Sequence, residues 1–246
     1  MKYDVIIVGA GPGGIFSAYE LLKKDPKLRV AVFEAGHSLE KRHCPIDGDK
    51  VKSCVGCNSC SIMSGFGGAG AFSDGKYNIT NDFGGTLYEY VGRKEAIELM
   101  KYVDGINMEY GGEGTKLYST AGTHFKKICL QNKLNLLDAS VRHLGTDVNF
   151  VVLENLYAKL KDDIDFFFDT PVREIKLAEG GYRICCDDGE YECEKCIVSV
   201  GRSGSKWMEE ACAGLNIPTR SNRVDIGVRV ELPAVIFSHL TDELYE

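Results

Sequence analysis

The sequence of 246 residues lacks any long hydrophobic run, and no apolar stretch approaches the roughly 18 residues of a membrane-spanning helix. It also lacks an export signal. The opening residues 1–4 (MKYD) lead directly into the apolar run 5–8 (VIIV), with no basic segment and no small-residue cleavage site. We therefore expect a cytoplasmic protein with no membrane partner.

Clustered positive charge is also missing. The chain has 29 Lys and Arg residues against 36 Asp and Glu, a formal net charge of -7, and its basic residues are scattered. Nucleic acids and anionic lipids select clustered basic residues. The charge pattern predicts no nucleic-acid partner and favours a small-molecule substrate or a redox partner. Internal repeats and low-complexity tracts are absent as well, as in an ordinary globular protein.

Glycine is abundant, and its first cluster lies between a predicted strand and a predicted helix. The apolar run 5–8 predicts a buried parallel strand that ends at residues 9–14 (GAGPGG), and helical spacing of apolar residues follows. A second apolar strand covers residues 29–33, and Glu34 stands at its end, 20 residues after Gly14. A G-x-G-x-x-G turn between a strand and a helix, followed by such an acid, predicts a dinucleotide site.

Each residue of this turn has a physical role in nucleotide binding. Gly9 permits the tight turn, Gly11 lets the backbone approach a pyrophosphate, and Gly14 allows close packing of helix on strand. The helix N-terminus supplies N–H donors to phosphates. Glu34 would accept hydrogen bonds from ribose hydroxyls and repel a 2′-phosphate, which argues against NADP in this site. The alternative is a glycine-rich turn that binds nothing.

Beyond residue 81 the pattern predicts helices, then strands. The expected helices cover residues 93–104, about 123–132 and 148–161, with a short strand at 135–139. Strands are expected at 166–168, 172–177, 182–186, 191–193 and 197–200. The middle three form a β-meander with a hairpin turn in residues 187–189. If the chain turns at Asp188 and Gly189, Ile184 lies opposite Cys193 and Cys186 opposite Tyr191.

Ten cysteines in a chain without an export signal indicate reduced thiols, metal ligands or core residues. Cys54, Cys57 and Cys60 follow two successive x-x spacings, and Cys44 could supply a fourth thiolate to an iron–sulfur cluster or zinc. The Cys-Pro continuation of ferredoxin-type loops is absent, and free thiols or a redox pair are the alternatives. Cys193 and Cys196 are expected in the core.

The turn that starts at Gly9 and the ending Glu34-Ala35-Gly36 resemble glutathione-reductase-type flavoproteins, which have two dinucleotide-binding domains. Further motifs resemble the largely uncharacterised bacterial FAD-dependent dehydrogenase family. They are the cysteine pattern and residues 64–76 (SGFGGAGAFSDGK), 142–147 (RHLGTD) and 224–231 (VDIGVRVE). The resemblance covers nearly the whole chain.

The resemblance implies a set of cofactor-binding residues. Gly9, Gly11 and Gly14 would meet the FAD pyrophosphate, and Glu34 the adenosine ribose. Further implied contacts come from Arg42, the loop residues Gly67, Gly68, Ala69 and Gly70, the backbone of Val172, and Gly201. Just before Gly201, Ser199 and Val200 stand where such flavoproteins usually have alanine and threonine. His143 is the candidate catalytic residue, because an imidazole near a flavin could move a proton at neutral pH. Its alternative role is to order the start of a helix near Val148 that Thr146 or Asp147 caps.

The predicted fold class is α/β: a Rossmann-like FAD-binding domain with a central parallel sheet and β-meander. The domain would comprise residues 1–80 and 147–212, with a helical insertion at 81–146 and the beginning of a substrate domain at 213–246. Such flavoproteins close the flavin site with a second glycine turn, and none follows Arg229, so we expect a truncated chain. An open groove after Val8 and Val200 should follow.

The function that these patterns predict is an FAD-dependent oxidoreductase, a dehydrogenase of unknown substrate whose flavin accepts and passes on a hydride or electrons. NAD(P) is an open candidate for the electron donor, although no second nucleotide site is recognisable. Two alternatives remain: a non-catalytic nucleotide-binding module with a structural zinc in the cysteine loop, and an electron-transfer protein that couples flavin to an iron–sulfur cluster.

Overall fold

The computed structural model describes residues 1–221, 224, 226–228 and 230–244. The chain divides into two compact units, here called the first unit (1–72 and 153–221) and the second unit (73–152 and 222–246). The motif at 224–231 includes residues 225 and 229, which lie outside the described residues. Within the described ranges, no helix has both the length and the apolar character that crossing a membrane requires.

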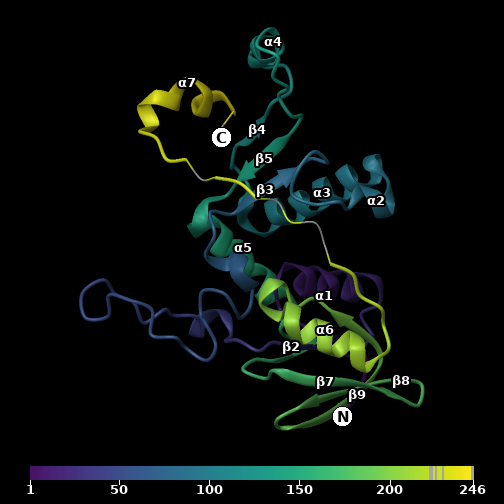
Figure 1. The fold of residues 1–246 in the computed structure, drawn as a ribbon. Coiled ribbons are helices and arrows are strands. Elements are labelled where there is room, and N and C mark those ends of the chain that lie inside the picture. The colour runs from purple at the N-terminus through teal and green to yellow at the C-terminus, as the bar shows by residue number, and fades with distance from the viewer. Residues whose placement is uncertain (222–223, 225, 229, 245–246) are drawn as a thin grey trace. The chain divides into compact units, whose positions relative to one another are not determined.

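A six-stranded sheet forms the centre of the first unit, with strand order β6-β2-β1-β9-β8-β7 (Figure 1). Strands β6, β2, β1 and β9 are parallel, and β7 and β8 continue the sheet as an antiparallel meander. This arrangement confirms the predicted α/β class with a central parallel sheet and a meander. The bounds are β1 (Lys2–Val8), β2 (Val30–Phe33), β6 (Ile164–Phe167), β7 (Val172–Ala178), β8 (Gly181–Cys186) and β9 (Gly189–Val198).

Helix α1 (Pro12–Lys24) lies where the sequence predicts the helix that follows the first glycine turn. It begins with a proline, whose missing N–H is no loss at a first helical position. It ends after Lys23 and Lys24, and its buried residues are Gly14, Ile15 and Ala18. The other helices of this unit are α5 (Gly145–Leu160), which enters this unit at residue 153, α6 (Ser205–Gly214) and the 3-10 turns η1 (Leu39–Lys41), η2 (Gly68–Phe72) and η4 (Arg202–Gly204).

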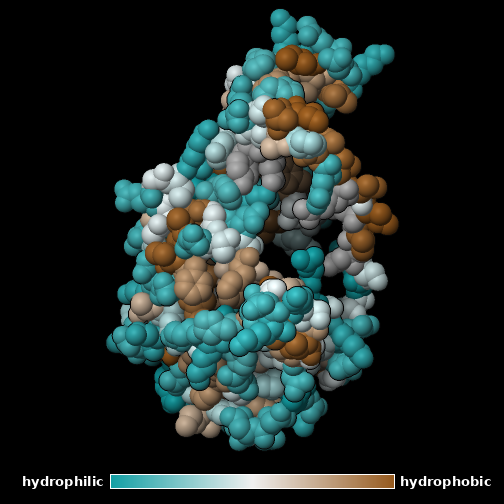
Figure 2. All heavy atoms as spheres, turned by 90° about the vertical axis from the view of Figure 1, so that its left-hand side faces the viewer, coloured by the Kyte–Doolittle hydropathy of each residue, from teal (hydrophilic) through white to brown (hydrophobic). Residues whose placement is uncertain are grey.

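Aromatic and β-branched side chains of the sheet form a core cluster in which Phe33 stacks on Phe167, with 4.6 Å between ring centroids. Cys193 is buried in this cluster and Cys196 packs against it, which confirms that this pair belongs to the core. On the face shown in Figure 2, hydrophilic residues predominate in the lower part of the picture. The unit thus separates an apolar interior from a solvated surface.

The predicted hairpin register is wrong by two residues. Ile184 pairs with Tyr191, and Cys186 pairs with Gly189, because Asp187 and Asp188 form the turn in place of Asp188 and Gly189. A shift of two residues leaves every side chain on its expected face, so the apolar face survives the error. The strands expected at 191–193 and 197–200 are one strand, β9.

The second unit contains a three-stranded antiparallel sheet with strand order β3-β5-β4. Its strands are β3 (Lys76–Ile79), β4 (Leu117–Ser119) and β5 (Ser140–His143). Its helices are α2 (Tyr88–Val91), α3 (Arg93–Asn107), α4 (Phe125–Gln131), α7 (Ala234–Leu244) and the start of α5, with the π-type turn η3 (Met108–Gly112) after α3.

Two expectations for this region need correction. The segment 81–146 is not purely helical, because it contributes β4 and β5; the strand expected at 135–139 begins instead at Ser140. Helix α5 begins at Gly145, three residues before Val148, so Thr146 and Asp147 lie within its first turn and do not cap it. Gly145 adopts a φ of 75°, which glycine reaches without strain and which lets the chain turn earlier than expected.

Candidate nucleotide-binding site

A cavity of about 350 Å³ lies at the carboxyl ends of β1 and β9 in the first unit. In parallel α/β sheets this is the usual position of ligand sites. The cavity confirms the groove expected after Val8 and near Val200. Its lining consists of Gly9, Gly11, Pro12, Gly13, Glu34, Met63, Ser64, Gly68, Ala69, Gly70, Ser199, Val200, Gly201, Arg202 and Ser203.

The three glycines of the first turn have different structural surroundings. Gly9 has a φ of 101°, and a Cβ there would lie 2.6 Å from the carbonyl oxygen of Ser199. A Cβ on Gly14 would overlap the carbonyl oxygen of Gly9. Gly11 differs, because its φ of -74° suits any residue and the nearest atom to an added Cβ is Gly68 Cα at 3.9 Å. The fold requires Gly9 and Gly14, whereas Gly11 keeps space open at the cavity.

Helix α1 begins at this cavity. Gly11 is its N-cap, no side chain caps it, and Pro12 and Gly13 of its first turn line the cavity. The first N–H groups of a helix have no intrahelical partner, and the helix dipole gives this end a partial positive charge. A phosphate group in the cavity would therefore meet N–H donors and a favourable electrostatic potential.

Glu34 also lines the cavity, although its side chain is only 8% exposed. Its Oε2 accepts a hydrogen bond from the Ala10 N–H at 2.8 Å, and its Oε1 accepts from the N–H groups of Gly36 and Gly65, each at 2.9 Å. The carboxylate thus joins the ends of β1 and β2 to residues 65–70, here called the glycine loop. The sequence predicts that Glu34 binds a ribose but carries no signal for these backbone contacts.

Arg42 is 2% exposed and does not line the cavity. Its Nε donates to the carbonyl oxygen of Ser61 at 2.8 Å, and its Nη2 donates to that of Ile62 at 2.9 Å. Its Nη1 donates to the carbonyl oxygens of Phe66 at 2.6 Å and Gly68 at 2.8 Å. Burial lowers the pKa of Arg42, and the charge of Glu34 opposes this effect. Arg42 therefore organises the glycine loop from behind.

The glycine loop is anchored by Phe66, which is fully buried and packs edge-to-face on Tyr157 with 5.0 Å between ring centroids. The Gly67 N–H donates to the Ala10 carbonyl at 2.8 Å, and Gly65, Gly67 and Gly68 all have positive φ angles. Of the predicted loop contacts, Gly68, Ala69 and Gly70 line the cavity, whereas Gly67 lies against Leu153.

Two further predicted contacts lie in different surroundings. Gly201 lines the cavity and has a φ of 65°. Val172 is buried in the core cluster and is not a lining residue, although the Thr170 N–H just before it donates to the Glu34 carbonyl at 3.0 Å. Sequence analysis missed Ser199 as a site residue; its hydroxyl donates to the Gly9 carbonyl at 3.1 Å. Its position directly after a strand that pairs with β1 is the signal that could have identified it.

The four cysteines proposed as metal ligands, Cys44, Cys54, Cys57 and Cys60, are all exposed. Across the described ranges, no group of three or more His, Cys, Asp or Glu residues is placed so that it could hold a metal ion. The structure does not bring these thiols together around one centre. Metal binding by this loop stays a prediction from their spacing.

His143, the candidate catalytic residue, lies in the second unit at the end of β5, opposite Lys76 of β3. The residue before it, Arg142, makes two hydrogen bonds with the Asp104 carboxylate, at 2.9 and 2.8 Å, and donates to the Thr115 carbonyl at 2.7 Å. The bonds to Asp104 raise the pKa of Arg142. These contacts hold β5 in place, and a role of His143 in proton transfer stays a prediction.

Comparison with known proteins supports the fold. Residues 1–40 match the model of the Thi4 family. No curated protein sequence matches the chain. The solved structure of glycine oxidase from Geobacillus kaustophilus is similar, with a TM-score of 0.50 and 17% identity over 87% of this chain and 58% of that one.

L-amino acid deaminase from Proteus vulgaris has a TM-score of 0.45 and 13% identity over 88% of this chain and 50% of that one. The chain therefore spans 58% and 50% of the length of these two proteins. At this level of identity, the likeness to glycine oxidase shows the fold, which is the predicted Rossmann-like α/β architecture.

Proposed function

We propose that this chain binds FAD and forms part of an FAD-dependent oxidoreductase. The observation that carries the proposal is the cavity at Gly11, where a glycine with ordinary backbone angles leaves space open beside a helix N-terminus and an acidic side chain. In dinucleotide-binding proteins, a helix N-terminus beside such a glycine and acidic residue binds the pyrophosphate.

Different residues of the cavity would bind different groups of the dinucleotide. The N–H groups at the start of α1 would bind the pyrophosphate, next to Gly11 and Gly13. Glu34 would bind the ribose. A carboxylate offers about four lone-pair sites, and backbone N–H groups use three of them. One site remains for a ribose hydroxyl donor, and the negative charge disfavours a 2′-phosphate at this position.

The loop residues Gly68, Ala69 and Gly70 would continue the binding surface toward the ribityl chain and the flavin ring. Bound flavin would supply the hydride and electron transfer. The protein's own contribution is to orient the cofactor and shield it, and the rigid support of the loop by Arg42 and Phe66 serves that purpose.

The oxidoreductase class rests on the similarity to glycine oxidase and on the motif resemblance to the bacterial FAD-dependent dehydrogenase family. Neither identifies the substrate, and NAD(P) is a candidate electron donor for which no second nucleotide site is recognisable. A flavin/iron–sulfur carrier and a nucleotide-binding module with zinc both require metal in the cysteine loop. Metal analysis and an absorption spectrum distinguish them, because flavin is yellow, iron–sulfur clusters are brown and zinc is colourless.

The test compares FAD binding by the wild type and by Gly11→Val, measured by quenching of flavin fluorescence. Valine fits the backbone angles at position 11 but fills the open space, so the variant should fold normally and lose FAD binding. Gly214→Val is the matched control, because Gly214 lies on α6 with no atom within 4 Å of an added Cβ. Equal FAD affinity of Gly11→Val and the wild type would overturn the proposal.

A further inference from the structure

The end of the motif at 64–76 and the motif at 142–147, which nucleotide binding does not explain, meet in the second unit. The end of the motif at 64–76 places Lys76 at the start of β3, directly opposite His143 of the motif at 142–147. The Leu144 N–H donates to the Gly75 carbonyl at 3.0 Å. A Cβ on Gly75 would lie 3.0 Å from the Gly145 carbonyl oxygen, so the two segments pack closely.

The sheet that these motifs build has two different faces. Residues directly opposite one another in antiparallel strands share a face. One face carries Tyr77, Leu117 and Arg142, and it is fixed by the Arg142–Asp104 pair and by a hydrogen bond from the Tyr77 hydroxyl to Asn149 Oδ1 at 3.0 Å. The other face carries Lys76, Asn78, Tyr118, Val141 and His143.

A cavity of about 370 Å³ borders the second of these faces. Most of its lining is apolar or aromatic, and Lys76 is the one charged side chain among the described residues that line it. Cavities of this size with an apolar wall and a few polar groups are typical of sites for small organic ligands. The apolar and aromatic lining residues are Phe83, Tyr118, Leu136, Leu137, Ala139, Val141 and Leu244.

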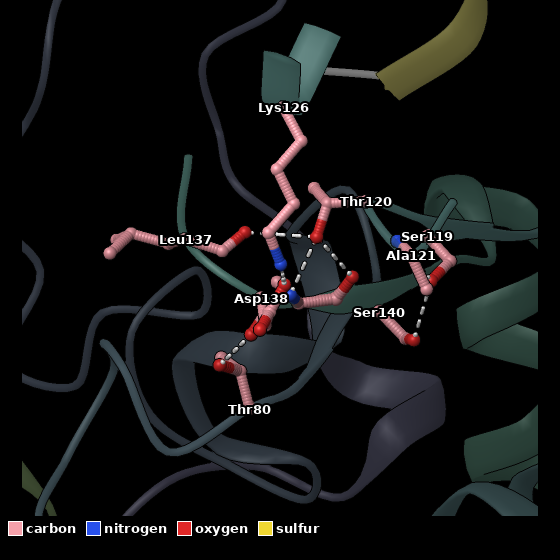
Figure 3. Close-up of polar contacts among 9 residues, drawn as sticks. Thr80, Ser119, Thr120, Ala121, Lys126, Leu137, Asp138 and Ser140 are labelled. Carbon is pink, nitrogen blue, oxygen red and sulfur yellow. Dashed lines mark hydrogen bonds and ion pairs between the residues drawn. The ribbon is translucent and has the colours of Figure 1, made fainter. Parts of the chain in front are cut away.

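Hydrogen bonds fix the wall that carries Leu136 and Leu137. The Thr120 hydroxyl donates to the Leu137 carbonyl at 2.9 Å and accepts from the Ala139 N–H at 2.9 Å (Figure 3). The Thr80 hydroxyl donates to the Asp138 carbonyl, and Lys126 pairs with the Asp138 carboxylate, both at 2.7 Å. A wall held in this way is preorganised, so binding loses little conformational entropy.

We propose that this cavity binds a small carboxylic acid with an apolar body. The apolar body would pack between Tyr118 and the leucines, and the carboxylate would pair with the Lys76 ammonium group. Lys76 is 28% exposed and lies 3.3 Å from Asp74, which is 68% exposed. A pair at this separation with one exposed partner contributes little, so a ligand carboxylate can compete with Asp74 for the ammonium group. The proposal concerns the second unit and does not rest on FAD binding.

The test measures binding of three probes of equal length to the full chain without FAD: 3-phenylpropionate, the neutral 3-phenylpropan-1-ol and the cation 3-phenylpropylamine. Methyl resonances of labelled Leu and Val residues report the site. We expect the acid to shift the methyl groups of Leu136, Leu137 and Val141, and to bind at least tenfold more tightly than the alcohol or the amine.

Two variants complete the experiment. Lys76→Gln should reduce the affinity of the acid to that of the alcohol and leave the alcohol unaffected. Lys94→Gln, at an exposed position of α3, is the matched control and should change nothing. The proposal is overturned if no probe shifts these methyl groups, if the acid and the alcohol bind equally to the wild type, or if Lys76→Gln preserves the preference for the acid. The wild-type comparison decides the question even if Lys76→Gln does not fold.

Discussion

Replacing Arg42 with lysine should loosen the glycine loop while the rest of the first unit stays folded. The guanidinium group donates four hydrogen bonds to carbonyl oxygens between Ser61 and Gly68. An ammonium group is a compact point charge and cannot span four carbonyls. Arg42→Met removes all four bonds and is the more severe variant.

The magnitude follows from the number and burial of these bonds. A hydrogen bond from a charged donor contributes about 1.5–3 kcal/mol net, and water that enters a loosened loop recovers part of that. We expect Arg42→Met to lower the local opening free energy of the loop by about 3–5 kcal/mol. At about 1.4 kcal/mol per factor of ten, even the lower limit accelerates amide exchange by more than about 100-fold.

Hydrogen exchange at the Gly65, Phe66, Gly67 and Gly68 amides is the assay, because each of these N–H groups donates to a protein acceptor. Arg173→Met is the control, since Arg173 is exposed and pairs with an exposed Asp187. FAD affinity should fall together with loop protection. Wild-type exchange rates in both Arg42→Lys and Arg42→Met would refute the view that this guanidinium holds the loop.

Three further predictions concern single contacts. Gly14→Ala should destabilise the first unit by about 3 kcal/mol or more, because its Cβ overlaps the Gly9 carbonyl. Gly11→Ala should lower the free energy of unfolding by less than about 1 kcal/mol. Equal urea midpoints for the two variants would contradict this prediction. Burial and the hydrogen bond to Asp165 raise the pKa of Tyr3 to about 12, so its contribution is complete below about pH 10 and disappears as pH rises toward 12. The stability difference between wild type and Tyr3→Phe should therefore shrink in that range, and a constant difference would show that Tyr3 ionises normally. Asp104→Asn leaves the Arg142 charge without its partner and should destabilise the second unit by about 3–5 kcal/mol; an unchanged thermal transition would show that the pair is not structural.

The sequence was sufficient to predict the parallel sheet and the position of the cavity. The run 5–8, the glycines at 9, 11 and 14 and the acid at 34 are local signals, and each follows from backbone geometry. The structure has a cavity at the end of β1, where these residues predict a binding site. The meander was also predictable, but its register was not, since strand periodicity does not determine which two residues form the turn.

The contacts that support the site could not be predicted. Glu34 accepts from Gly65, 31 residues away, and Arg42 reaches Gly68 across 26 residues; no periodicity encodes either contact. The sheet of the second unit was missed for another reason. Its strands have only three or four residues, and polar residues occupy both faces, so they lack the alternation that identifies a strand.

The most direct test of the central claim is a titration of the ¹⁵N-labelled chain with FAD, followed by amide chemical shifts. We expect the largest changes at Gly11, Gly13 and Gly14 and in the loop residues Gly68 to Gly70, with little change in the β8–β9 hairpin. FAD binding that leaves the amides at the start of α1 unchanged, or no binding at all, would contradict the assignment of this cavity as the dinucleotide site.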